Sequence, residues 1–281
     1  MTPSTLSPVS PVSPASAIRQ SVDRSIIAAL HLPDLSVARH TSMAYLEDYV
    51  LANAGVFAAA GVPSLMLQDQ TRQNGPATAA TVALMAALGR LLRSTYAALD
   101  LGIIIQAHDA VAPLAIAHAC GASYVRLKVF VGAAMTMEGA KSALAIEARS
   151  FRHELRRDDI AILADVFDRT SVPMIDVPPE EAAQAAVRLG ADGLILTAAT
   201  FADSLARVRS AKAVGVTRPV WIGGSVTEQN VAQALAVADG AIVSTSLMCD
   251  APDADALLRW DSDKTQRFMD AVRALPPAGG R

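Results

Sequence analysis

The feature that most constrains this chain is a regular alternation of short apolar runs and helical segments. Eight runs rich in Val, Ile, Leu and Ala are each followed by a segment with helical periodicity, and the connections are short. Such alternation predicts a parallel sheet, because each helix returns the chain to the same end of the sheet. The predicted strands are residues 25–32, 62–67, 102–106, 124–131, 160–164, 193–197, 220–222 and 241–243. The predicted helices are residues 42–61, 77–99, 110–120, 139–157, 180–189, 203–214, 227–239 and 263–275.

An open doubly wound sheet would also explain the alternation, but eight units at nearly even spacing favour closure. The predicted fold class is α/β, with a single (β/α)8 TIM barrel over residues 21–281. Residues 1–20 repeat Ser-Pro-Val and lack the basic start and apolar middle of a secretory signal, so we expect a disordered tail.

Composition excludes several classes of protein. Hydrophobic residues make up 52% of the chain and aromatics only 4%, so the core must consist of Ala, Val, Leu and Ile. The net charge is -3 and no segment is rich in Lys and Arg, which predicts no nucleic-acid partner. No uncharged apolar run reaches the about 18 residues of a membrane span. Two cysteines, Cys120 and Cys249, fit a reduced cytoplasmic chain.

Glycine-containing segments recur just before two of the predicted strands. Gly190-Ala191-Asp192-Gly193 precedes strand six and Ala238-Asp239-Gly240 precedes strand eight. We interpret both as helix-stop signals at the bottom of the barrel, with a role in stability. Trp221, inside strand seven, is predicted to be a packing residue.

Residues 219–246 predict a phosphate site. The loops after strands 7 and 8 of such barrels commonly hold an anion, because oriented amides favour negative charge. A glycine turn follows strand seven, Thr227 is a plausible N-cap of the next helix, and two hydroxyls follow strand eight. The predicted phosphate-binding residues are Gly223, Gly224, Ser225, Ser244 and Ser246.

Lys128 and Asp165 are the leading catalytic candidates. Of four lysines, only Lys128 falls on a predicted strand, and alternation places it on the same face as Arg126, a candidate substrate-binding residue. A lysine among apolar walls could act as a base or form an imine. The alternative is a structural pair with Asp165, which ends strand five. Asp168 and Arg169 are expected to face solvent.

His31 and His108 end strands one and three, so both could exchange protons near neutral pH at the barrel mouth. Capping or core histidines are the alternative. Asp69, after strand two, is a candidate substrate-binding residue, whereas Asp109 is expected to cap the following helix. A divalent metal is possible, but no metal-binding motif is present. The chain also lacks the glycine motifs typical of nicotinamide, flavin and P-loop nucleotide sites.

Several segments, taken in order, resemble one known family. They are His31-Leu32-Pro33, Tyr124-Val125-Arg126, Ala164-Asp165-Val166, Gly190-Ala191-Asp192-Gly193-Leu194-Ile195-Leu196-Thr197, Gly223-Gly224-Ser225-Val226-Thr227-Glu228-Gln229-Asn230 and Ala238-Asp239-Gly240-Ala241-Ile242-Val243-Ser244-Thr245-Ser246. Over residues 31–250 this set resembles the BtpA family, which includes SgcQ-like proteins. The resemblance implies a ribulose-phosphate-binding type of barrel. The family is named for photosystem I biogenesis, and SgcQ-like members accompany sugar-metabolism systems.

The chain departs from the family pattern at the barrel mouth. The changed positions, with the usual residues in brackets, are Gln68-Asp69 (Glu-Asn), Ala107-His108 (Arg-Asn), Lys128 (Asn), Arg169-Thr170 (Lys-His) and Met248 (Lys). From the predicted barrel, its phosphate site and the family resemblance, we expect a homo-oligomeric barrel enzyme acting on a phosphorylated sugar or related metabolite, as a lyase, aldolase or isomerase. The alternatives are a non-catalytic biogenesis or assembly factor and a nucleoside or nucleotide hydrolase.

Overall fold

A computed structural model describes residues 25–37, 41–73, 75–251 and 256–276. The tail predicted for residues 1–20 lies outside the described residues.

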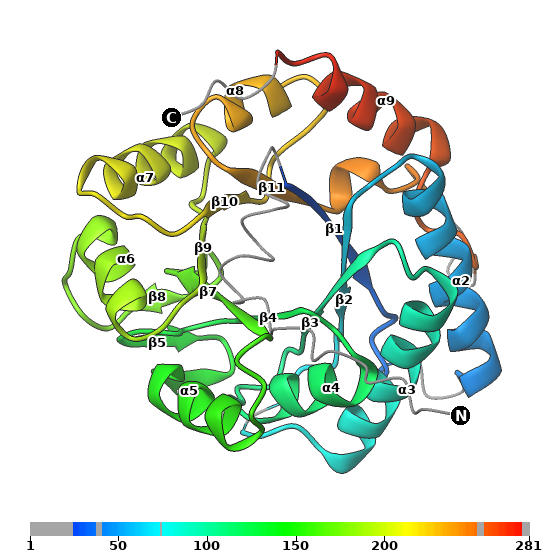
Figure 1. Cartoon of the computed structure of the whole chain (residues 1–281), viewed down its shortest axis with the longest axis horizontal. Coiled ribbons are helices and arrows are strands. Elements are labelled where there is room, and N and C mark those ends of the chain that lie inside the picture. Colours follow the sequence, from blue (N-terminus) through cyan, green and yellow to red (C-terminus); the bar gives the residue numbers. More distant parts are fainter. Residues whose placement is uncertain (1–24, 38–40, 74, 252–255, 277–281) are drawn as a thin grey trace, which may run out of the picture.

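Eight parallel strands form a closed barrel, as the sequence predicts (Figure 1). Each strand pairs with its neighbours in chain order, and β1 closes the ring by pairing with both β2 and β11. Almost every strand residue is buried, which is why these segments read as continuous apolar runs rather than alternating ones. The strands are β1 (Ser25–His31), β2 (Ser64–Gln68), β3 (Asp100–Ile104), β4 (Tyr124–Leu127), β7 (Ala161–Val166), β9 (Gly193–Leu196), β10 (Val220–Gly223) and β11 (Gly240–Val243).

Helices surround the barrel in an outer ring (Figure 1). Ser42 and Thr78 begin two of them, because each side chain accepts a hydrogen bond from a free backbone N–H of the first turn. Gly121 ends another in the left-handed conformation. The helices are α2 (Met43–Ala59), α3 (Ala79–Thr95), α4 (Ala112–Cys120), α5 (Ala145–Glu154), α6 (Pro179–Arg188), α7 (Phe201–Ala213), α8 (Val231–Leu235) and α9 (Ser262–Arg273).

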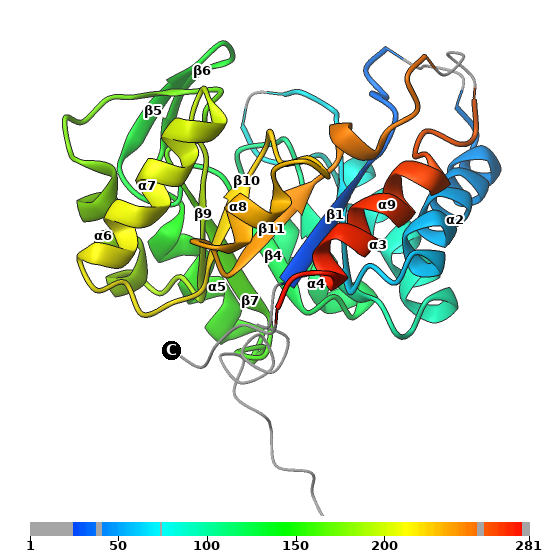
Figure 2. The ribbon, with the colours of Figure 1, turned by 90° about the horizontal axis from the view of Figure 1, so that it is seen from above.

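The prediction of one long helix over residues 139–157 is wrong. The chain instead forms a small antiparallel sheet of β5 (Ala133–Thr136), β6 (Gly139–Ser142) and β8 (Val172–Pro173), and α5 begins only at Ala145. Gly132 and Gly139 both adopt positive φ, which favours a hairpin at this point rather than a continuing helix. This sheet stands beside the barrel on the side where the strands end (Figure 2).

The helix predicted over residues 227–239 is also shorter in the structure. Residues 227–230 form a turn, in which the Thr227 amide donates to the side chain of Asn230, and α8 starts at Val231. Thr227 is therefore not the N-cap, and the five-residue α8 offers no extended helix end to an anion.

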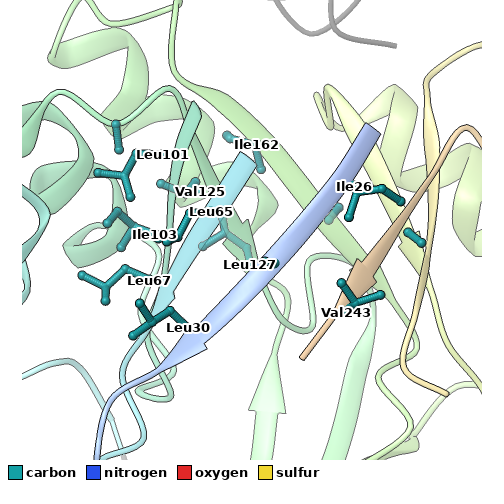
Figure 3. Packing of buried hydrophobic residues seen from close by; sticks show 14 of the residues in the cluster. Ile26, Leu30, Leu65, Leu67, Leu101, Ile103, Val125, Leu127, Ile162 and Val243 are labelled. Carbon is teal, nitrogen blue, oxygen red and sulfur yellow. The ribbon is translucent and has the colours of Figure 1, made fainter. Parts of the chain in front are cut away.

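The core has two layers. Outward-facing strand residues pack against the helices, including Ile26, Leu65, Ile103 and Val125 (Figure 3). A second cluster fills the barrel interior below the strand ends, with Ile27, Met66, Leu163 and Ile195 among its members. Both layers consist mainly of aliphatic side chains, in agreement with the composition.

Two aromatic rings plug the barrel interior, and each lies against glycines of neighbouring strands. A Cβ at Gly102 would lie 2.0 Å from the ring of Tyr124, and one at Gly193 or Gly240 would lie about as close to Trp221, at 2.5 Å and 2.4 Å. Trp221 is thus a packing residue, as predicted. Gly240 opens β11 and makes room for this ring, so its role is not that of a helix stop.

Candidate active site

A cavity of about 620 Å³ opens where the barrel strands end. Residues at or after the ends of β1, β2, β3, β4, β9, β10 and β11 line it, together with the loop after β7 and the β5–β6 hairpin. This is the face on which barrel enzymes place their active sites. Most positions that depart from the family pattern line this cavity: Gln68, Ala107, His108, Lys128, Arg169 and Thr170.

The cavity carries an excess of positive charge although the whole chain is acidic. Five cationic side chains and three carboxylates line it. They are Arg72, Arg126, Lys128, Lys141 and Arg169, against Asp109, Glu138 and Asp168. A cleft with this balance raises the local concentration of anions.

The predicted phosphate loop lies on one wall. Gly224 and Ser225 both adopt positive φ, at 71° and 59°, and neither amide donates a hydrogen bond within the described residues. A Cβ added to Gly224 would lie 2.9 Å from Nη1 of Arg169, which shows that the guanidinium lies directly over this turn. Arg169 makes no side-chain hydrogen bond or ion pair in the described part of the chain. Two amides that donate no hydrogen bond and one unpaired guanidinium therefore lie at the same turn.

The two serines after β11 differ in their contacts. The Ser244 hydroxyl donates to the carbonyl of Ala29, at 2.9 Å. The Ser246 hydroxyl is buried and has no partner among the described residues, yet Ser246 belongs to the cavity wall. Of the two, Ser246 is the one whose hydroxyl has no partner within the described residues.

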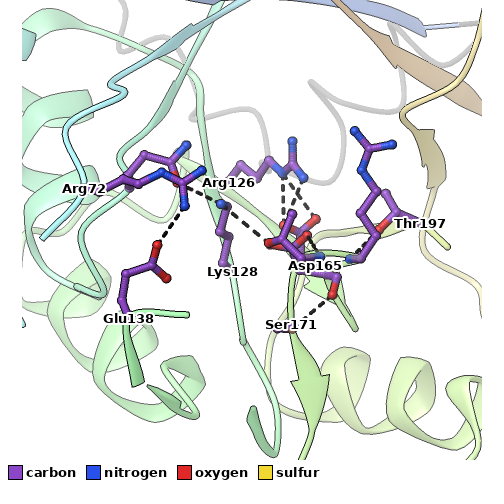
Figure 4. Close-up of polar contacts among 11 residues, drawn as sticks. Arg72, Arg126, Lys128, Glu138, Asp165, Ser171 and Thr197 are labelled. Carbon is purple, nitrogen blue, oxygen red and sulfur yellow. Dashed lines mark hydrogen bonds and ion pairs between the residues drawn. The ribbon is translucent and has the colours of Figure 1, made fainter. Parts of the chain in front are cut away.

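Lys128 lies one residue beyond β4 rather than on the strand as predicted, because Val129 leaves the β conformation with φ 48°. Its Nζ donates to Oε1 of Gln106 at 2.8 Å and lies 3.6 Å from the carboxylate of Asp168 (Figure 4). The alternative prediction, that Lys128 pairs with Asp165, is therefore wrong, because the partner of Lys128 is Asp168. Burial favours the neutral form of Asp168, but Lys128 and the hydrogen bonds from Thr170 outweigh it and lower the pKa of this carboxyl.

Asp165 pairs with Arg126 instead. Nε and Nη2 of Arg126 donate to the two carboxylate oxygens at 3.0 to 3.2 Å, and both residues lie deep in the barrel (Figure 4). Asp165 is 2% exposed and does not line the cavity, whereas Arg126 does. Burial raises the pKa of the Asp165 carboxyl, and the charge of Arg126 opposes that rise.

His31 and His108 both reach the cavity wall. Burial lowers the pKa of His31 to about 4, with a further contribution from the charge of Arg126. His31 is therefore neutral at pH 7. The expectation that it titrates near neutral pH is wrong. Burial also lowers the pKa of His108, whose Nε2 has no partner among the described residues.

The two remaining aspartates lie at the edge of the site. Asp69 is buried outside the cavity, and one of its oxygens accepts from the amide of Thr71. Asp109 accepts hydrogen bonds from the amides of Val111 and Ala112 and so caps α4, as predicted. Among the residues described, no three His, Cys, Asp or Glu side chains are grouped as metal ligands.

Asp168 and Arg169 were expected to face solvent, and both instead line the cavity, although Arg169 is largely exposed. The predicted strand ends at residue 164, whereas β7 continues to Val166, so the loop that carries Asp168 and Arg169 begins two residues later than expected. Val166 is an apolar residue just beyond the predicted strand, and it was the sequence signal that could have extended the strand to its observed end. Within the described segments, no helix has the length and apolar character needed to cross a membrane.

Comparisons with known proteins agree with this architecture. The solved structure of 3-hexulose-6-phosphate synthase superposes with a TM-score of 0.56 at 15% identity, covering 88% of this chain and 99% of that one. An uncharacterized protein of Archaeoglobus fulgidus is 28% identical over 232 residues, which are 80% of this chain and 91% of that protein.

The photosystem I biogenesis protein BtpA of Synechocystis sp. is 34% identical over 149 residues. That match spans only 52% of each chain, about half the length of the relative. The model of the BtpA family matches residues 22–274, nearly the whole chain. This protein belongs to the BtpA family.

Proposed function

We propose that this chain is an enzyme that acts on a phosphorylated sugar or related metabolite, as a lyase, aldolase or isomerase. The observation that carries the proposal is that two amides without an acceptor, at Gly224 and Ser225, lie at the same turn as the unpaired guanidinium of Arg169. A phosphate dianion can accept from all three at once, and the charge-assisted bonds to Arg169 would be the strongest. Gly223, Ser244 and Ser246 complete this wall.

The reacting carbon would lie between the phosphate wall and Lys128. The ammonium of Lys128 and the carboxylate of Asp168 form a donor–acceptor pair, and neutral His31, which lines the same cavity, is the candidate proton acceptor. His108 contributes to the same wall. Asp165 does not reach the cavity, so its proposed role is to position Arg126. Binding energy gained at the phosphate would place the carbon skeleton among these groups.

A thermal-shift screen tests the phosphate site. Inorganic phosphate, glycerol 3-phosphate and sugar phosphates are compared with their unphosphorylated counterparts, with and without Mg²⁺ or Zn²⁺. A ligand present at a hundred times its Kd stabilises the folded state by about 2.7 kcal/mol. We expect stabilisation by phosphorylated compounds in the wild type and its loss in Arg169→Gln. Arg209→Gln, an exposed change on α7, is the matched control and should respond like the wild type.

Equal responses to phosphorylated and unphosphorylated compounds would refute the proposal. The other candidate is a non-catalytic biogenesis or assembly factor, which the name of the Synechocystis relative favours. Lys128→Ala separates the two functions once a substrate is found, because an enzyme loses turnover while the folded barrel remains. An assembly role would be indifferent to Lys128 and sensitive to surface changes.

A further inference from the structure

The floor of the cavity holds a second cationic group that the phosphate wall does not use. Arg126 extends from β4 into the barrel interior, one layer above the ring of Tyr124. Its side chain is only 14% exposed and belongs to the cavity lining. Arg126 thus lies deeper than Arg169, whose side chain is exposed at the rim.

Asp165 fixes the orientation of this guanidinium. Nε and Nη2 are both engaged with the carboxylate, whereas Nη1 makes no hydrogen bond within the described residues. An arginine held in this way has lost its conformational freedom before any ligand arrives, so a ligand bond to Nη1 costs little ordering entropy. The pair presents a fixed N–H donor to the cavity.

The charge of Arg126 is already balanced by Asp165, and that of Lys128 is balanced by Asp168. The phosphate wall is different, because the charge of Arg169 has no counter-ion in the described part of the chain. A dianionic phosphate therefore belongs at Arg169. The balanced floor, with a fixed donor and the neighbouring ammonium of Lys128, suits a planar monoanion that accepts hydrogen bonds through two oxygens.

We propose that the ligand carries a second anionic group, a carboxylate, bound by Arg126 Nη1 and Lys128 Nζ at the cavity floor. The substrate class is then a phosphorylated hydroxy or oxo acid, rather than a neutral sugar phosphate. This assignment rests on the phosphate site proposed above. The carboxylate assignment makes Arg126 a specificity-determining residue for that end of the ligand. The carboxylate subsite at Arg126 and the phosphate subsite at Arg169 lie on different strands and loops, so each can be changed without the other.

Matched ligands separate the two ends. The first set shares a three-carbon skeleton: glycerol 3-phosphate, glycerate and 3-phosphoglycerate. The second pair, sorbitol 6-phosphate and 6-phosphogluconate, covers a longer reach. Binding is measured by isothermal titration calorimetry with the full chain. In at least one set we expect the phosphorylated acid to bind about tenfold or more tightly than the phosphorylated alcohol. The alcohol lacks the carboxylate and so loses its charge-assisted hydrogen bonds to Arg126 and Lys128, and a tenfold change in affinity is the size expected for one such bond.

Two variants assign that preference to Arg126. In Arg126→Met/Asp165→Leu, which removes both buried charges together, the preference should disappear while the affinity for the phosphorylated alcohol stays within about twofold. Arg126→Lys, which keeps the charge, provides a second test should the double variant fail to fold; it should reduce the preference. In Arg169→Gln both compounds should weaken together and the preference should remain.

The outcomes are distinct. Equal affinities for acid and alcohol in both sets would overturn the carboxylate assignment and leave the phosphate site standing. A preference that survives in both Arg126 variants would also overturn it. Binding of no phosphorylated compound would overturn the phosphate site and, with it, this assignment.

Discussion

The depressed pKa of His31 makes the stability of this protein depend on pH in a way that a single substitution can remove. His31 ends β1 inside the cavity wall, with the ring of Trp260 6.1 Å away in an edge-on contact. Burial and the nearby charge of Arg126 lower its pKa from 6.5 to about 4. The unfolded chain therefore binds a proton at this site between these two values, and the folded chain does not.

The sign and size follow by linkage. A base with a depressed pKa in the folded state costs stability as the pH falls from 6.5 towards 4. Between pH 7.5 and pH 5 the loss is about 2 kcal/mol, and it reaches about 3 kcal/mol below pH 4. His31→Gln cannot titrate, and the hydrogen bond from Tyr49 to residue 31 survives because it uses the backbone carbonyl.

Urea unfolding followed by far-UV circular dichroism at both pH values measures the effect. We expect the wild type to lose about 2 kcal/mol more than His31→Gln between pH 7.5 and pH 5, because other titrating groups cancel in the comparison. His153→Gln, an exposed change on α5, should keep the full wild-type dependence. If the wild type and His31→Gln lose the same free energy of unfolding within about 0.5 kcal/mol, the burial of His31 does not control its charge.

Three further predictions concern the stability of the barrel and its oligomeric state. Asp165→Asn leaves the guanidinium of Arg126 buried without a counter-charge, so we expect a loss of about 3 kcal/mol in urea unfolding, and no loss would contradict the pairing. Gly102→Ala places a Cβ against the ring of Tyr124 and should cost about 1–3 kcal/mol, part of which Tyr124→Leu should restore in the double variant. Alanine-rich outer helices lead us to expect a homo-oligomer, which light scattering coupled to gel filtration checks; a monomeric mass would reject it.

The sequence predicted the barrel because the strands are buried on both faces and several helices are bounded by recognisable signals. Ser42 caps α2 at its predicted start, Thr78 caps α3 one residue after the predicted start at residue 77, and Gly121 ends α4. Those signals are local, so a single chain displays them. The same holds for Asp109, which lies three residues before Ala112, the first residue of α4, and accepts from the amides of Val111 and Ala112.

The failures lie where tertiary contacts override local pattern. Residues 139–157 contain good helix formers, yet Gly139 begins the second strand of a hairpin, and the first strand, β5, pairs on its other side with Val172 of a distant loop. The partners of Lys128 and Asp165 depend on where β4 and β7 end relative to one another. In the structure β4 ends four residues earlier than predicted and β7 ends two residues later, and Lys128 pairs with Asp168 whereas Asp165 pairs with Arg126.

The aromatic plug of the barrel has a consequence for the order of events during turnover. Tyr124 and Trp221 are each 3% exposed and close the interior below the cavity, so molecules enter and leave through the mouth. In a cleavage reaction, the fragment held near Arg126 would lie beneath the fragment held near Arg169. The upper fragment must then depart first, and the lower one would act as a competitive inhibitor of the next substrate molecule.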